Sequence, residues 1–188
     1  MVTNEKIVLD RKMEQERTLV RSQNILIQRD KKSQNELIVR GQEHLQIYRT
    51  AEYHLTMAVS ALRGKDYQKA IAEFKETLRI NPEYAEAHYY LGIMYFLINR
   101  YEDAIEAYTG AINIDPTNYM AYLSLGVVYH LSGKYDDAIK AYKQTIKLSP
   151  NLAEAHSRLG SAYAAKGMRK EAVEAYREAL RIKFESIV

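Results

Sequence analysis

The sequence predicts an all-α fold in which four helix pairs follow one another without insertion. Three observations lead to this prediction. The motif Leu-Gly-x-x-Tyr starts at Leu91, Leu125 and Leu159, in steps of 34 residues. An alanine followed four residues later by an aromatic residue recurs in the same steps, starting at Ala70, Ala104, Ala138 and Ala172. The only prolines of the chain lie on the same grid, at Pro82, Pro116 and Pro150.

The four units span residues 51–84, 85–118, 119–152 and 153–186. Within the second unit, small and apolar residues recur at the spacing of two amphipathic helices: Ala87, Leu91, Tyr95, Ala104, Tyr108 and Ala111. The prolines follow the second helix of a unit and end it. Acidic pairs such as Glu102-Asp103 and Asp136-Asp137 open the second helices, where carboxylates complement the helix dipole.

Glycines occupy two kinds of position in the units. Gly92, Gly126 and Gly160 fall inside the first helix, where glycine costs about 1 kcal/mol relative to alanine, so we expect a close approach between helices there. Gly133, Gly167 and Asn99 fall at the turn between the two helices, where a left-handed residue ends a helix. We therefore expect positive φ angles at these three turn residues.

The first 50 residues precede the repeats and contain one glycine and no proline. Apolar clusters alternate with charged residues, and we predict a helical segment that caps the first unit or mediates self-association. A seven-residue spacing of apolar residues is interrupted by Gln34 and Gly41, so support for a continuous coiled coil is weak. Strands or disorder remain alternatives for residues 1–40.

Composition excludes several classes of function. The chain has no cysteine, which excludes disulfides, cysteine zinc sites and a thiol nucleophile. Its charge is +3, and residues 51–188 carry equal numbers of acidic and basic residues, which argues against a nucleic-acid-binding surface. No apolar run is long enough for a signal peptide or a membrane span, so we expect a cytoplasmic protein without an integral membrane segment.

No catalytic or metal site is predicted, and we expect neither enzyme activity nor a cofactor. His54, His88 and His156 all occupy the fourth position of their units. Equivalent positions of successive units lie too far apart to share a metal ion, so we predict core packing for these histidines. The acidic pairs recur with the repeat at exposed helix starts, and no phosphate-binding loop or oriented nucleophile is recognisable.

The 34-residue pattern of Leu-Gly, Tyr, Ala, aromatic and closing Pro resembles that of the tetratricopeptide repeat (TPR) family. The resemblance covers residues 51–186 and implies a right-handed α-α superhelix. The end units depart most from the pattern: Met57, Ala58 and Ala61 replace Leu, Gly and Tyr in the first, and Phe184 takes the proline position in the fourth. Such departures are typical of end repeats, which lack a neighbour on one side.

The resemblance also implies a concave groove lined by the first helix of each unit. Carried over residue by residue, the family's groove positions predict a partner-binding surface made of Leu55, Val59, Tyr89, Tyr90, Ile93, Phe96, Leu97, Met120, Leu123, Val127, His130, Leu131 and Arg158. About a dozen apolar side chains at roughly 30 to 50 Å² each give a patch of about 400 to 600 Å², which reaches the largest patch of a typical monomer. The resemblance therefore implies a protein or peptide partner with an apolar or amphipathic segment.

One class of partner is excluded by the same positions. Family members that clamp the acidic C-terminal tails of chaperones use Lys, Asn and Arg on the groove helices. This sequence has Leu55, Val59, Tyr90, Met120 and Ser124 at the corresponding places. We therefore do not expect a carboxylate clamp.

Three functions remain open, all of them non-enzymatic. The first is an adaptor or scaffold that binds an apolar segment in the groove. The second is a self-assembling protein whose groove or C-terminal flank is filled by another copy, and the third is a regulatory subunit of a separate enzyme. Only five residues follow the last expected helix, so we expect its apolar flank to be exposed and the chain to form homo-oligomers through this flank, the N-terminal clusters or both. The flank residues are Val173, Tyr176, Leu180 and Phe184.

Overall fold

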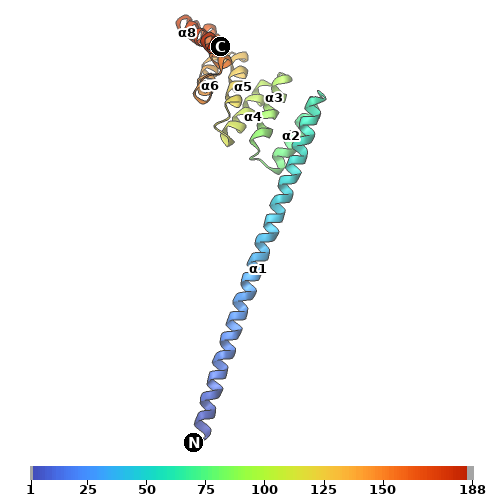
Figure 1. Cartoon of the computed structure of the whole chain (residues 1–188). Coiled ribbons are helices and arrows are strands. Elements are labelled where there is room, and N and C mark those ends of the chain that lie inside the picture. Colours follow the sequence, from blue (N-terminus) through green and yellow to red (C-terminus); the bar gives the residue numbers. More distant parts are fainter. Residues whose placement is uncertain (1, 186–188) are drawn as a thin grey trace. The chain divides into compact units, whose positions relative to one another are not determined.

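The computed structural model describes the backbone of residues 2–185, and the side chains of residues 14, 17–18, 20–26 and 28–185. This part of the chain forms helices and no strand (Figure 1). The helices are α1 Val2–Arg63, α2 Tyr67–Ile80, α3 Ala85–Leu97, α4 Tyr101–Ile114, α5 Tyr119–Leu131, α6 Tyr135–Leu148, α7 Ala153–Ala165 and α8 Arg169–Glu185. The chain divides into two compact units, residues 1–47 and residues 48–188.

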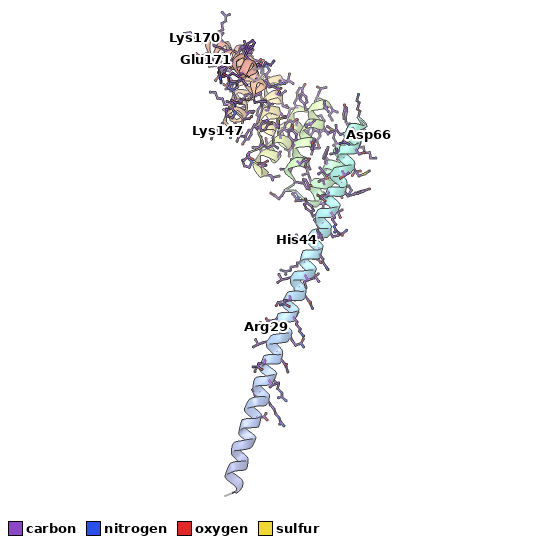
Figure 2. The ribbon with its side chains drawn as sticks, viewed as in Figure 1. Arg29, His44, Asp66, Lys147, Lys170 and Glu171 are labelled. Carbon is purple, nitrogen blue, oxygen red and sulfur yellow. The ribbon has the colours of Figure 1, made fainter. Side chains whose placement is uncertain are left out.

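The first unit is helical from residue 2 to residue 47, as part of α1. This outcome favours helix over the strand and disorder alternatives for residues 2–40. Every side chain described between residues 14 and 49 is exposed, including Arg29 and His44, which Figure 2 labels. Large apolar side chains are among them, for example Ile25 and Leu37, each 68% exposed.

The second unit is a solenoid of helix pairs. Within pairs, α3 packs on α4, α5 on α6 and α7 on α8; between pairs, α2 packs on α3, α4 on α5 and α6 on α7. First helices also touch across pairs, α3 with α5 and α5 with α7. Figure 1 shows this succession from α3 to α8. The all-α repeat architecture predicted from the 34-residue spacing is confirmed.

Tyrosine rings of the second helices pack against the glycines of the first helices. A Cβ atom added to Gly92 would lie 2.6 Å from Cδ1 of Tyr108, and one added to Gly126 would lie 2.5 Å from Cε1 of Tyr142. Both tyrosines are fully buried. The glycines are therefore required by a close helix approach, as their place inside a helix predicts.

The turns between paired helices use left-handed residues at equivalent positions. Asn99, Gly133 and Gly167 have φ angles of 58°, 71° and 77°, which confirms the prediction for all three. The first pair uses Lys65, with φ 60°, which was not predicted because lysine has no preference for this region of the backbone.

Helix ends follow the predicted signals. The second helices α2, α4 and α6 have the C-cap residues Asn81, Asp115 and Ser149, each of which directly precedes a proline. A residue before proline is pushed out of the helical region, so the position of the proline fixes the helix end. The acidic pairs lie in the first turns of α4 and α6, and Asp103 also accepts hydrogen bonds from Arg100 at 2.7 and 2.8 Å.

Candidate functional site

An apolar groove lies across the first helices α3, α5 and α7. Its volume is about 340 Å³. α3 and α5 supply most of its lining, with one residue from α4 and two from α7. The lining residues are Tyr89, Ile93, Phe96, Leu97, Tyr108, Met120, Leu123, Ser124, Val127, Glu154 and Arg158.

Eight of the thirteen residues predicted for the partner-binding surface line this groove. They are Tyr89, Ile93, Phe96, Leu97, Met120, Leu123, Val127 and Arg158. Seven of the eight are apolar or aromatic, and Leu97 and Met120 are 44% and 40% exposed. The groove thus presents apolar surface to solvent rather than enclosing it.

The other five predicted residues lie outside the groove. Leu55, Val59 and Tyr90 pack against the core around α2, α3 and α4. The Tyr90 ring stacks on the buried ring of Phe74, with centroids 5.7 Å apart and planes 10° apart. His130 packs edge-on against Tyr135 at 5.3 Å, and Leu131 is 53% exposed beyond the groove. Tyr90 lies outside the groove because its ring stacks on Phe74 of α2, on the side of the core.

Tyr108, Ser124 and Glu154 line the groove although they were not among the thirteen. The sequence pattern placed Tyr108 in an amphipathic helix of the second unit, and its ring is buried beside Gly92. The recurring Ala-x-x-x-aromatic spacing identifies this tyrosine, but the pattern alone does not reveal that one edge of the ring reaches the groove. Ser124 and Glu154 do occupy groove positions of the repeat, although they were left out of the thirteen residues.

The tyrosine hydroxyls of the site are neutral at physiological pH. Burial raises the pKa of Tyr89, with an opposing hydrogen bond to Ser124. Burial also raises the pKa of Tyr108. Outside the lining, burial raises the pKa of Tyr142 to about 12 against the opposing effect of Arg158. The only charges in the lining belong to Arg158 and Glu154, which form an ion pair at 2.7 Å. The groove is therefore apolar along α3 and α5 and carries a self-neutralised charged edge on α7.

Comparisons with known proteins agree with this geometry. Tetratricopeptide repeat models match residues 55–119, 107–140 and 153–185, and a TPR repeat model matches residues 128–167. These matches cover the helix pairs that build the groove. The chain belongs to the tetratricopeptide repeat family.

Solved structures with the same fold include several of MamA. One crystal structure of MamA is 31% identical, covers 78% of this chain and 86% of its own, and superposes with a TM-score of 0.72. A structure of MamA from residue 41 to its end, from Desulfovibrio magneticus RS-1, is 24% identical, with coverages of 72% and 76% and a TM-score of 0.68. A comparison with curated protein sequences finds no match.

The histidines at the fourth position of the TPR units have a role different from the predicted core packing. All three rings are half-buried. Nε2 of His88 donates to the carbonyl of Pro82 at 3.0 Å, and Nε2 of His156 donates to the carbonyl of Pro150 at 2.9 Å. Each ring therefore holds the loop before its helix in place, because it donates a hydrogen bond to a proline carbonyl that has no partner within a helix.

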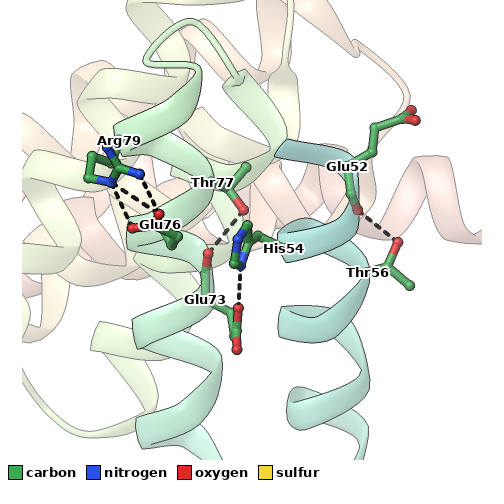
Figure 3. A network of polar contacts seen from close by, with 7 residues as sticks. All are labelled: Glu52, His54, Thr56, Glu73, Glu76, Thr77 and Arg79. Atoms are coloured by element: carbon green, nitrogen blue, oxygen red, sulfur yellow. Dashed lines mark hydrogen bonds and ion pairs between the residues drawn. The ribbon is translucent and has the colours of Figure 1, made fainter. Parts of the chain in front are cut away.

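His54 has a different partner because no proline loop precedes it. Its Nδ1 lies 2.7 Å from Oε2 of Glu73 on α2, as Figure 3 shows. In the same view, the hydroxyl of Thr77 donates to the backbone carbonyl of Glu73 at 3.0 Å. The contact between His54 and Glu73 joins α1 to α2 in the first helix pair.

No helix within residues 2–185 combines the length and apolar character needed to cross a bilayer. The repeat fold, the family and the exposed apolar groove together support a protein-interaction scaffold.

Proposed function

We propose that this chain is a non-catalytic TPR scaffold that binds an apolar or amphipathic segment of a partner protein in the groove of α3, α5 and α7. The supporting observation is that Leu97 and Met120, from neighbouring repeats, expose 44% and 40% of their surface in one groove. Burying apolar surface contributes about 25 cal/mol per Å², so an exposed apolar groove favours association with an apolar partner surface.

The form of the groove favours side chains of a protein segment over a complete small molecule. A volume of about 340 Å³ is at the small end of the range for small-molecule pockets, about 300 to 1,000 Å³. Small-molecule sites also carry several polar groups that fix orientation. Here the polar groups are the Tyr89, Tyr108 and Ser124 hydroxyls and one ion pair at the edge. Two or three apolar anchors of a helix or extended peptide suit such a surface.

The site does not suit an acidic tail. The only basic residue of the lining is Arg158, which donates to Glu154 through Nε at 2.8 Å and pairs with it through Nη2 at 2.7 Å. A bound carboxylate would have to compete with Glu154 for that guanidinium. We therefore propose recognition by apolar contact and shape, with Arg158 and Glu154 orienting a polar group at one end of the segment.

The experiment is a selection of peptide ligands from a display library of random segments, followed by affinity measurements on purified full-length chain. We expect the selected peptides to carry apolar residues at helical or alternating spacing. Fluorescence anisotropy then compares wild type with Leu97→Asp and Met120→Asp. Both positions are substantially exposed, so both variants should keep the helical circular-dichroism signal and the melting temperature.

The expected loss follows from the exposed surface. Complete burial of a leucine is worth about 1.5 to 3 kcal/mol, so the exposed 44% of Leu97 accounts for about 0.7 to 1.3 kcal/mol. A buried aspartate adds a desolvation cost, so we expect at least about a tenfold loss of affinity. Leu131→Asp is the matched control, because Leu131 is 53% exposed on α5 but outside the groove. Equal affinity of wild type and both groove variants would refute the proposed site.

A second candidate is self-assembly, in which the bound segment comes from another copy. It is favoured by the exposed apolar side chains along the helix of residues 14–47, such as Ile25, Leu37 and Ile38 at 68%, 68% and 57%. Sedimentation equilibrium of Leu37→Asp and Leu97→Asp separates the candidates. If both substitutions remove an association that wild type shows, the groove is filled by the N-terminal helix of a second copy.

A further inference from the structure

The outer flank of α8 exposes four large apolar side chains. Val173, Tyr176, Leu180 and Phe184 are 55%, 37%, 55% and 67% exposed, as predicted for this flank. This flank is separate from the groove of α3, α5 and α7, because none of these four residues lines that groove.

Comparison with the preceding repeat identifies what kind of surface this is. Ile139 and Tyr142 hold the same repeat positions on α6 as Val173 and Tyr176 hold on α8, and they are only 8% and 1% exposed. α6 differs from α8 in that a following helix, α7, packs against it. The flank of α8 thus has the chemistry of a helix-packing surface, and within the described residues no helix follows it.

A groove of about 630 Å³ lies beside this flank, between α7 and α8. Ser157, Ser161, Leu180 and Lys183 are among its lining residues. The Tyr176 hydroxyl, which also lines it, donates to Oγ of Ser161 at 3.0 Å. In the preceding repeat, the positions equivalent to Ser157, Ser161 and Tyr176 are Leu123, Val127 and Tyr142, which pack in the core cluster that α7 completes. The groove therefore lies where a following helix would pack, and we call it the helix seat.

Basic residues on the flank specify the chemistry of that helix. Lys75 and Lys143 place Nζ 5.8 Å from the ring centroids of Tyr95 and Tyr163, each on the helix that follows. Arg177 holds the same repeat position on α8, so it is placed to lie over an aromatic ring of the helix in the seat. Asp136 pairs with Lys166 of α7, and the equivalent position on α8 is Lys170, so the matching residue of the occupant should be acidic.

We propose that the α7–α8 flank is a second docking surface, which takes one amphipathic helix of a partner protein in the way that α6 takes α7. The helix carries an apolar stripe against Val173, Leu180 and Phe184. An aromatic residue lies over Arg177, and a carboxylate lies opposite Lys170.

A second copy of the chain fits this seat less well. The helix of residues 14–47 of another copy has no Phe, Tyr or Trp that could lie over Arg177. The part of α1 within the repeats carries Tyr53, which is 60% exposed, where α3, α5 and α7 have fully buried alanines. Ser60 is exposed where α3 and α5 have the buried Met94 and Val128. An α8 helix of another copy would bring its own basic residues against Lys170 and Arg177. The partner helix is therefore a different chain with acidic residues on its edges.

The test uses a fluorescein-labelled peptide of residues 150–168 carrying Lys166→Glu, titrated with the full-length chain. This peptide contains α7, the helix that occupies the equivalent seat on α6, and the substitution supplies the carboxylate for Lys170. We expect saturable binding of this helix in the groove. Leu180→Asp in the chain should weaken binding at least tenfold, Arg177→Glu about fivefold, and Tyr163→Ala in the peptide about threefold.

Leu97→Asp, in the other groove, is the control and should leave the Kd unchanged. Circular dichroism checks the fold, and Phe184→Asp replaces Leu180→Asp if that variant unfolds. Absence of binding up to about 1 mM, or loss of binding in Leu97→Asp but not in Leu180→Asp, would overturn the proposal. Self-association of wild type at about 100 μM that Leu180→Asp removes would also overturn it, because the occupant would then be a second copy.

Discussion

Replacing Gly126 with alanine should destabilise the repeat domain, whereas the same change at Gly160 should not. The added Cβ at Gly126 would lie 2.5 and 2.7 Å from Cε1 and Cδ1 of Tyr142. Tyr142 is 1% exposed, so its ring has no free space into which to move. At Gly160 the added Cβ would lie 2.9 Å from the Tyr176 ring, but that ring is 37% exposed and can turn outward.

The two effects of the substitution have opposite signs. Alanine in place of glycine in a helix contributes about 0.8 to 1.0 kcal/mol of stability. Overpacking a buried site costs about 1 to 3 kcal/mol. Gly126→Ala should therefore lose about 0 to 2 kcal/mol, and Gly160→Ala should gain up to about 1 kcal/mol. The difference between the two free energies of unfolding should be about 1 to 3 kcal/mol, the overpacking cost alone.

Urea unfolding followed by circular dichroism at 222 nm measures both variants against wild type. The double variant Gly126→Ala/Tyr142→Leu removes the ring and should recover part of the loss, which gives a coupling energy for the contact. Equal changes in the two glycine variants would refute the reasoning, because the propensity term alone would then explain both. A stabilised Gly126→Ala variant would show that the helices separate without cost.

Three further predictions concern the stability of the repeats. Leu125→Ala truncates a core side chain that is 8% exposed, and it should lower the free energy of unfolding by about 2 to 5 kcal/mol; a loss below about 1 kcal/mol would contradict its core position. Lys65→Gly should raise stability by up to about 1 kcal/mol, because Lys65 has φ 60° and a side chain there is strained; an unchanged denaturation midpoint would contradict this. Tyr142 has a pKa raised to about 12, so its neutral form stabilises the fold below the unfolded pKa of about 10, and this contribution is lost as the pH rises toward 12. Between pH 10 and pH 12, the free energy of unfolding of Tyr142→Phe should therefore fall by about 2 kcal/mol less than that of wild type. Urea unfolding at each pH measures both proteins, and parallel pH profiles would contradict the raised pKa of Tyr142.

The repeat architecture could be predicted because its signals are local and act through the backbone. A proline ends a helix whatever surrounds it, and the turn positions of Asn99, Gly133 and Gly167 depend on φ alone. Gly92 and Gly126 inside helices predicted a close approach of the neighbouring helix, and the Tyr108 and Tyr142 rings do pack against them. Lys65 was missed because its positive φ is imposed by its place in the repeat and not by its own side chain.

The groove was predicted less completely because its lining depends on how side chains pack between neighbouring helices. The repeat position assigned Tyr90 to the groove, but Phe74 of the preceding helix offers an aromatic face 5.7 Å away, and the ring stacks there instead. Tyr108 packs against Gly92 and also lines the groove, although its repeat position is not one of the family's groove positions. Position within a repeat predicts the direction of a Cβ atom, whereas the neighbouring helix decides where the end of a large side chain lies.

The N-terminal segment illustrates a different limit. Residues 14–47 include short β-branched runs that suit strands as well as helices, and their described side chains are all exposed. Without a packed face there is no period in the apolar pattern, so the helix was predicted but strands and disorder stayed open as alternatives for residues 1–40.

The most direct test of a partner-binding groove is an NMR titration of the chain labelled with ¹³C at the methionine methyl groups. Met120 is 40% exposed and lines the groove, whereas Met94 is fully buried in the core and Met168 lies in the turn between α7 and α8. On addition of a selected peptide, we expect the Met120 methyl signal to shift and saturate with the same Kd as the anisotropy measurement, while the Met94 and Met168 signals stay in place. Saturable binding that shifts Met168 and leaves Met120 unchanged would contradict the proposal that the groove of α3, α5 and α7 holds the partner.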